Sequence, residues 1–178
     1  MVDCESLRHD AIDNAVTILI EPIRVADAEA FHACLDAVSR ERLYLALLEA
    51  PSLDDVRAFV AQNVERGVPQ VVARVSDVVV GWCDIVPGWH HTLRHCGSVG
   101  MGLLPAYRGQ RLGEALLSRC LTLATAAGIT RVELEVRLDN ARAVALYTRL
   151  GFRREGIKVR GMRVDGQYID TLAMSLIV

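Results

Sequence analysis

The chain has 178 residues, of which 52% are hydrophobic and 24% are charged, and its formal net charge at pH 7 is -2. This length and composition predict one folded domain, residues 1–178, with a proper hydrophobic core, and they exclude a disordered protein. The nearly balanced charge excludes a broad basic surface, so we expect no nucleic-acid partner.

The sequence carries no signal for membrane insertion or export. No uninterrupted apolar run approaches the roughly 20 residues that a membrane-spanning helix needs. Residues 1–10 are too polar for a signal peptide. We therefore expect a cytoplasmic protein with no membrane partner.

The cysteines are five in number, which is odd, and none has C-x-x-C spacing. We expect buried free thiols in a reducing compartment rather than disulfides or a nucleophile. The five are Cys4, Cys34, Cys83, Cys96 and Cys120.

One segment has the residue types of a metal site. It holds His90, His91, His95 and Cys96. Structural zinc sites generally recruit paired ligands from two separated elements, and these four residues lie in one short segment. We therefore predict a loop with solvated histidines and no metal.

The first half of the chain predicts a strand, two helices and a hairpin. Residues 16–24 read as a strand, and residues 27–40 have the apolar spacing of a helix. Ser52 is placed to cap a second helix. Two runs rich in branched residues flank Ser76 and Asp77, which favours an antiparallel hairpin.

The second half alternates strands and helices. Residues 98–104 are an apolar run that leads through a turn into a helix ended by Gly128. Its apolar stripe is expected to consist of Leu112, Ala115, Leu116, Leu123 and Ala126. Further expected elements are a strand at 131–136, a helix capped by Asp139 or Asn140 and ended by Gly151, and strands at 153–160 and 168–177.

The turn before the Gly128 helix has features of a phosphate site. A helix start presents unpaired N–H groups and positive dipole charge, and both favour anions. Gly109 and Gly113 permit close approach to the backbone, while Arg108 and Arg111 add guanidinium groups that fit phosphate oxygens. The G-x-G-x-x-G and Walker patterns are absent. The alternative is an ordinary strand-to-helix turn with solvated arginines.

Residues 98–152 resemble the acetyl-CoA-binding core of the Gcn5-related N-acetyltransferases. The pyrophosphate motif of that family, Arg/Gln-x-x-Gly-x-Gly/Ala, falls on Arg108, Gly109, Gln110, Arg111, Leu112 and Gly113. A second pattern resembles the ribosomal-protein alanine N-acetyltransferase branch in particular. It falls on Leu134, Glu135, Val136, Asn140, Ala143, Leu146, Tyr147, Leu150, Gly151 and Phe152.

Two positions depart from the family pattern. Arg111 stands where the family usually has Gly, which alters the closest backbone approach to a pyrophosphate. Ser98 stands where many relatives carry Glu, so the strand before the loop offers no base at that position.

The resemblance implies an α/β fold: a mixed, twisted sheet with helices on both faces, whose fourth and fifth strands splay apart around acetyl-CoA. It implies that strand backbone near Leu103 and Leu104 pairs with pantetheine and that one of these N–H groups polarises the thioester carbonyl. It places the pyrophosphate on the N–H groups of residues 109–114. The predicted contacts of acetyl-CoA are thus Leu103, Leu104, Arg108, Gly109, Gln110, Arg111, Leu112, Gly113, Glu114, Asn140, Ala143 and Tyr147.

The implied activity is direct transfer of an acetyl group from acetyl-CoA to a primary amine within a ternary complex, without a metal. An attacking amine must lose its proton, and some base has to accept it. Glu135 matches the Glu that serves as base in the ribosomal-protein alanine N-acetyltransferase branch. The alternative is that Glu135 is only a paired acid and water carries the proton. Tyr147 matches a residue that protonates the CoA thiolate, although a helix-face tyrosine can simply pack.

The acceptor stays open at this stage, because residues 39–52 and 158–168, which would form its site, match no motif. A peptide N-terminus and a small amine both fit. Lys158, Arg160 and Arg163 could attract a carboxylate or form a solvated hairpin. Other classes also remain, namely a non-catalytic CoA-binding or sensor module and another kind of nucleotide-binding protein. Homodimers are common in the family, and the sequence leaves a homodimer open.

Overall fold

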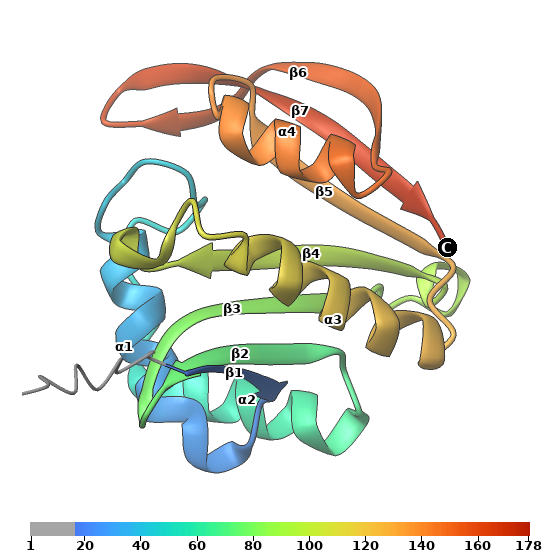
Figure 1. Ribbon diagram of the computed structural model, residues 1–178. Helices are drawn as coiled ribbons and strands as arrows, with labels where there is room; N and C mark the ends of the chain where they lie inside the picture. The colour runs from blue at the N-terminus through green and yellow to red at the C-terminus, as the bar shows by residue number, and fades with distance from the viewer. Residues whose placement is uncertain (1–16) are drawn as a thin grey trace, which may run out of the picture.

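The computed structural model describes residues 17–178, which form one seven-stranded mixed sheet (Figure 1). Val16 of the first predicted strand and Cys4 lie outside the described residues. The strand order across the sheet is β1-β2-β3-β4-β5-β7-β6. The strands are β1 (Ile18–Pro22), β2 (Gln70–Val75), β3 (Val78–Pro87), β4 (Cys96–Leu103), β5 (Arg131–Arg137), β6 (Arg153–Val164) and β7 (Gln167–Ile177).

Helices cover both faces of this sheet, which confirms the predicted fold class (Figure 1). Side chains of α3 and α4 share one core cluster with inward residues of β2 to β5 and β7. Side chains of α1 and α2 form a second cluster with Val72, Val79 and Trp82 on the opposite face. The helices are α1 (Ala28–Ser39), α2 (Leu53–Arg66), α3 (Leu112–Ala126) and α4 (Ala141–Arg149).

The sheet opens between β4 and β5, as the family resemblance implies. These two strands are parallel, and they pair only from Cys96 opposite Arg131 to Ser98 opposite Glu133. Beyond Ser98 they diverge, and β5 continues paired with β7 along its whole length (Figure 1). The sheet therefore has two halves joined at one end, with an open gap between the last residues of β4 and β5.

Local signals position the helices around this gap. The Ser52 hydroxyl accepts a hydrogen bond from the Asp55 N–H at 3.2 Å, which caps α2 as predicted. The Asn140 Oδ1 atom accepts from the Ala143 N–H at 3.1 Å and caps α4. Gly128 and Gly151 follow α3 and α4 with φ of +82° and +92°, a conformation that glycine adopts without steric cost.

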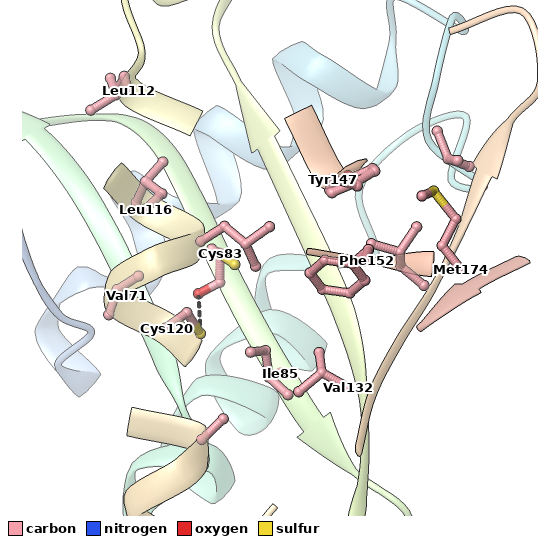
Figure 2. Close-up of a cluster of buried hydrophobic side chains, with 14 of the residues drawn as sticks. Val71, Cys83, Ile85, Leu112, Leu116, Cys120, Val132, Tyr147, Phe152 and Met174 are labelled. Atoms are coloured by element: carbon pink, nitrogen blue, oxygen red, sulfur yellow. Dashed lines mark hydrogen bonds between the residues drawn. The ribbon is translucent and has the colours of Figure 1, made fainter. Parts of the chain in front are cut away.

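Two sequence predictions are wrong in detail. Ala115 and Ala126 are exposed, and the buried stripe of α3 instead runs through Leu116, Leu117 and Cys120. The stripe shifts because Cys120 packs on β3, where its thiol donates a hydrogen bond to the Cys83 carbonyl at 3.5 Å (Figure 2). The final hairpin is also tighter than predicted, since β6 extends to Val164 and includes two irregularities of register.

The cysteines that the structure describes are free thiols, as predicted. Cys34, Cys83 and Cys120 are buried, and Cys96 is half-buried. Within residues 17–178, no three His, Cys, Asp or Glu side chains lie together in a group that could hold a metal ion. In the same part of the chain, every helix is too short or too polar to span a membrane.

Candidate active site

The N-terminus of α3 is an open cluster of backbone N–H groups at the end of β4. The first intrahelical bond runs from the Ala115 N–H to the Arg111 carbonyl at 3.1 Å, and no side chain of the described residues caps the helix. Arg111, the N-cap residue, has φ +60°, and Gly109 has φ +79°. The turn therefore uses the left-handed conformation twice. This explains why the related family usually has Gly at the position of Arg111.

The polar side chains of this turn form hydrogen bonds and ion pairs with other residues of the protein. The Arg108 guanidinium donates to the Leu103 carbonyl at 2.9 Å and forms an ion pair with Glu41. The Gln110 amide donates to the Ala106 carbonyl at 3.0 Å, and Glu114 pairs with Arg149 of α4 at 3.1 Å. The anion-binding capacity of the turn thus lies mainly in its backbone, and the phosphate contact of Arg108 stays a prediction.

The free edge of β4 supplies fewer donors than the sequence prediction assumed. The Leu104 N–H donates to the Val80 carbonyl at 2.9 Å and so points into the sheet. This N–H is therefore not available to a thioester, and of the two predicted N–H groups only that of Leu103 remains a candidate. Hydrogen bonding alternates along an antiparallel strand, so the backbone groups of Met101 and Leu103 point the other way, into the gap. Met101 was missed because it matches no motif.

Gly113 lets α3 approach this edge closely. A Cβ atom at this position would lie 3.4 Å from side-chain atoms of Leu103 and Leu146 and 3.5 Å from the Met101 methyl group. The structure thus brings together Leu103 and Gly113, predicted from the first motif, and the α4 residue Leu146 of the second. Leu112 is buried beside them in the same core.

Tyr147 lies on α4, whose N-cap is Asn140 and whose first turn holds Ala143. Its ring packs against Phe152 with centroids 5.8 Å apart, near Met174 of β7 (Figure 2). The side chain is only 8% exposed. Burial raises the pKa of the Tyr147 hydroxyl above its ordinary value of 10. The phenol is therefore protonated at neutral pH and can act as a proton donor.

Glu135 lies on β5 and faces the other side of the sheet. Its neighbours Leu134 and Val136 point into the cluster that holds Tyr147, so the alternation of the strand turns Glu135 away. The Thr171 hydroxyl donates to its carboxylate at 2.5 Å, and Lys158 forms an ion pair with it. The hydrogen bonds from Lys158 and then Thr171 lower the pKa of Glu135. This geometry favours the paired-acid interpretation.

The loop between α1 and α2, residues 40–52, crosses to both halves of the sheet on this face. Glu41 pairs with Arg108 after β4, and Arg42 pairs with Asp165 in the β6–β7 turn. The Leu43 carbonyl accepts from Arg137 on β5. The loop is thereby tied to elements on both sides of the gap.

A pocket of about 460 Å³ lies between this loop, α1, α2 and the sheet. Its floor contains Trp82 and Asp84 of β3 with Gly100 and Met101 of β4. Asp84 is 8% exposed, and burial raises the pKa of its carboxyl to about 7, an effect that the hydrogen bond from the Gly100 backbone partly opposes. The sequence prediction missed Asp84. The available signal was an acid inside an otherwise apolar strand.

Comparison with known proteins identifies the family. Residues 33–152 match the family described as "Acetyltransferase (GNAT) family". The chain belongs to this family. The N-alpha-acetyltransferase RimI of Mycobacterium tuberculosis is 46% identical over 66 residues, which cover 37% of this chain and 40% of that protein. This match supports the GNAT branch named from the second motif.

Solved GNAT structures share the whole fold. An acetyltransferase of the GNAT family from Streptococcus pneumoniae superposes with a TM-score of 0.86 and 26% identity, covering 91% of this chain and all of that one. YncA, a putative acetyltransferase from Salmonella typhimurium solved with its cofactor acetyl-CoA, gives a TM-score of 0.84 at 21% identity and covers 90% of this chain and 94% of that one. For several curated relatives, RimI among them, the matched segment spans only 26–40% of the relative.

The left-handed conformation of Arg111 yields a stability prediction. A Cβ atom in this region costs about 1 kcal/mol. We expect Arg111→Gly to have a free energy of unfolding about 1 kcal/mol higher than Arg111→Ala, measured by urea denaturation. Both variants lack the guanidinium, so their difference isolates the backbone. Equal stabilities would contradict the left-handed turn.

The raised pKa of Asp84 predicts a pH-dependent stability. Its carboxyl has a pKa of 3.8 when exposed and about 7 in the fold, so folding favours the protonated form. Its stabilising contribution is complete below pH 4 and is lost as the pH rises through 7. Wild type should therefore lose about 2–3 kcal/mol of stability relative to Asp84→Asn between pH 5 and pH 8. The exposed turn variant Asp77→Asn is the matched control and should show no such trend.

Proposed function

We propose that this protein transfers an acetyl group from acetyl-CoA directly to a primary amine, a small molecule or a peptide N-terminus, in a ternary complex. One observation carries the proposal: β4 and β5 part after Ser98, and the free edge of β4 leads to the uncapped N-terminus of α3. This arrangement offers a strand edge to an amide-containing arm and N–H groups to a pyrophosphate. Because two core clusters cover the two faces of one sheet, we propose a single catalytic domain over residues 1–178.

The residues of the turn and of β4 would bind acetyl-CoA as a co-substrate. The N–H groups of residues 109–114 fit the pyrophosphate, with Arg111 free to add charge at the surface. The Leu103 carbonyl already accepts from Arg108, so the Leu103 N–H would donate to the pantetheine arm. The Met101 N–H would donate to the thioester carbonyl. A backbone donor at a developing oxyanion contributes on the order of 3 kcal/mol to transition-state stabilisation. The side-chain NH₂ group of Asn140 remains for a donor contact.

Tyr147 would complete the reaction as general acid. The amine nitrogen forms a bond with the acetyl carbon, the carbon–sulfur bond breaks with its electron pair on sulfur, and the phenol protonates the departing thiolate. Burial keeps the Tyr147 phenol protonated at neutral pH, so its proton is present when the thiolate forms. Glu135 is already paired with Lys158, so we assign it to charge balance on the acceptor side.

A non-catalytic CoA-binding or sensor module is the second candidate. Ser98 favours it, because the strand before the turn offers no acid at the position where many relatives have one. The protonated Tyr147 beside the gap favours catalysis instead. The reduced cysteines suit the cytoplasm, and a homodimer stays a prediction.

Ligand-dependent unfolding tests the donor site. Acetyl-CoA and CoA at a hundred times their Kd should stabilise the fold by about 2.7 kcal/mol, seen as a higher Tm. NAD and ATP at the same concentrations serve as controls for general phosphate binding. A shift with NAD or ATP alone would show that the turn holds a different phosphate ligand.

Replacing the phenol tests the proton donor. Tyr147→Phe should lower kcat by one to several orders of magnitude, because the thiolate leaves unprotonated, while the Tm shift with acetyl-CoA stays unchanged. Turnover is measured by thiol release. Unchanged turnover would leave Tyr147 with a packing role only.

Neutralising Glu135 separates its two interpretations. We expect Glu135→Gln to lower kcat/KM by less than about tenfold, since an ion-paired carboxylate with a lowered pKa is a weak base. The measurement is the kcat/KM for an amine at pH 7.5. A loss above a hundredfold that abolishes the pH dependence would identify Glu135 as the base.

A further inference from the structure

The pocket described above adjoins the gap at the point where chemistry would occur. Gly100 and Met101 form part of its floor, and they follow Ser98, the last residue of β4 that pairs with β5. Met101 also presents its backbone to the gap. The pocket and the proposed thioester position therefore share one stretch of β4.

Glycines leave this floor open. On the face that holds Trp82 and Asp84, β4 contributes Gly100 and Gly102. A Cβ at Gly100 would lie 2.8 Å from the Asp84 Oδ1 atom, and one at Gly102 would lie 2.3 Å from the Trp82 ring. The Asp84 carboxylate thus leans from β3 across β4, toward the edge that borders the gap.

Asp84 forms no ion pair with the described residues that line the pocket. Among the residues that the structure describes, no cation lines the pocket, and the other acid is Asp55 of α2, which is exposed and bonded to Ser52. The neighbouring Cys83 points to the opposite face, and burial raises the pKa of its thiol. The remaining walls are apolar side chains of α1, the α1–α2 loop and α2. They include Phe31, Leu35, Leu45, Leu47, Val56 and Phe59.

We propose that this pocket binds the acceptor as a primary amine with an apolar side chain, and that Asp84 is the base that receives its proton. This inference rests on the acetyltransferase function proposed above. The apolar walls disfavour a charged or strongly polar substituent, and the volume fits a branched or aromatic group.

The proton balance follows from this arrangement. An ammonium entering the pocket meets the Asp84 carboxylate and transfers a proton to it, which leaves two neutral groups in an apolar site. Asp84 passes this proton to solvent. The neutral amine then attacks the acetyl carbon, and the cationic nitrogen that results gives its second proton to the Asp84 carboxylate, which passes it to solvent as well. The carbon–sulfur bond breaks, Tyr147 protonates the thiolate, and the Tyr147 phenolate is reprotonated from solvent, so one proton is released overall. A carboxyl that titrates near the working pH suits this role, and the paired Glu135 does not.

The catalytic test compares Asp84→Asn with wild type and with Asp77→Asn, an exposed acid of the same hairpin. Thiol release is measured from pH 5.5 to 9 with 3-methylbutylamine, 2-phenylethylamine and ethanolamine. For wild type and Asp77→Asn we expect kcat/KM to rise with pH around pH 7. We also expect kcat/KM to be at least tenfold higher for the two apolar amines than for ethanolamine. In Asp84→Asn, kcat/KM should no longer rise near pH 7 and should be lower by about a hundredfold or more. The Tm shift from acetyl-CoA should be unchanged.

Binding of an amine in the pocket can be measured by tryptophan fluorescence, without any catalytic turnover. The chain has two tryptophans, and Trp89 is 84% exposed while Trp82 lies in the pocket floor. In a Trp89→Phe background, 2-phenylethylamine should change the Trp82 fluorescence saturably, and ethanolamine should not at the same concentration.

The outcomes separate the two proposals. If acetyl-CoA does not stabilise the protein, the acetyltransferase function fails and this inference fails with it. If acetyl-CoA binds but the apolar amines are not preferred, the substrate class is wrong. If the kcat/KM of Asp84→Asn still rises near pH 7 and its activity stays within threefold of wild type, Asp84 is not the base.

Discussion

The early end of pairing between β4 and β5 is the constraint on which the rest of the structure depends. Buried backbone groups need hydrogen-bond partners, and the last residues of β4 have none from β5. The divergence creates a strand edge inside the protein, next to the open N-terminus of α3. Arg108, Arg137 and Asp165 anchor the α1–α2 loop to both sides of the gap. The same opening therefore borders the proposed donor site on one face and the pocket on the other.

The surroundings of two carboxylates near this opening shift their pKa values in opposite directions. Glu135 accepts hydrogen bonds from Lys158 and Thr171, which lower its pKa and keep it ionised. Asp84 sits in a pocket whose described lining, within residues 17–178, is mainly apolar and holds no cation, and burial raises its pKa to about 7. Residue type alone makes them equivalent, whereas the environment gives them different chemistry. Tyr147, on the other face, is kept protonated by the same effect of burial.

Much of the fold could be predicted from the sequence because its signals are local. Ser52 and Asn140 cap helices through contacts three residues away, and Gly128 and Gly151 end helices through their own φ angles. The donor motif likewise lies within one turn. Predictions failed where packing between distant segments decided the outcome: Ala115 is exposed because α3 docks through Cys120, and the Leu104 N–H is taken by β3.

The sequence by itself determined the order of the elements, the family and the glycine-containing turn before α3, since each depends on residues close together in the chain. Only the tertiary structure decided the states of the side chains at the site. The partner of Arg108 is 67 residues away, that of Glu135 is 23 residues away, and Asp84 leans over a glycine of another strand. Charge pairing and burial are properties of the folded surroundings, so no local pattern specifies them.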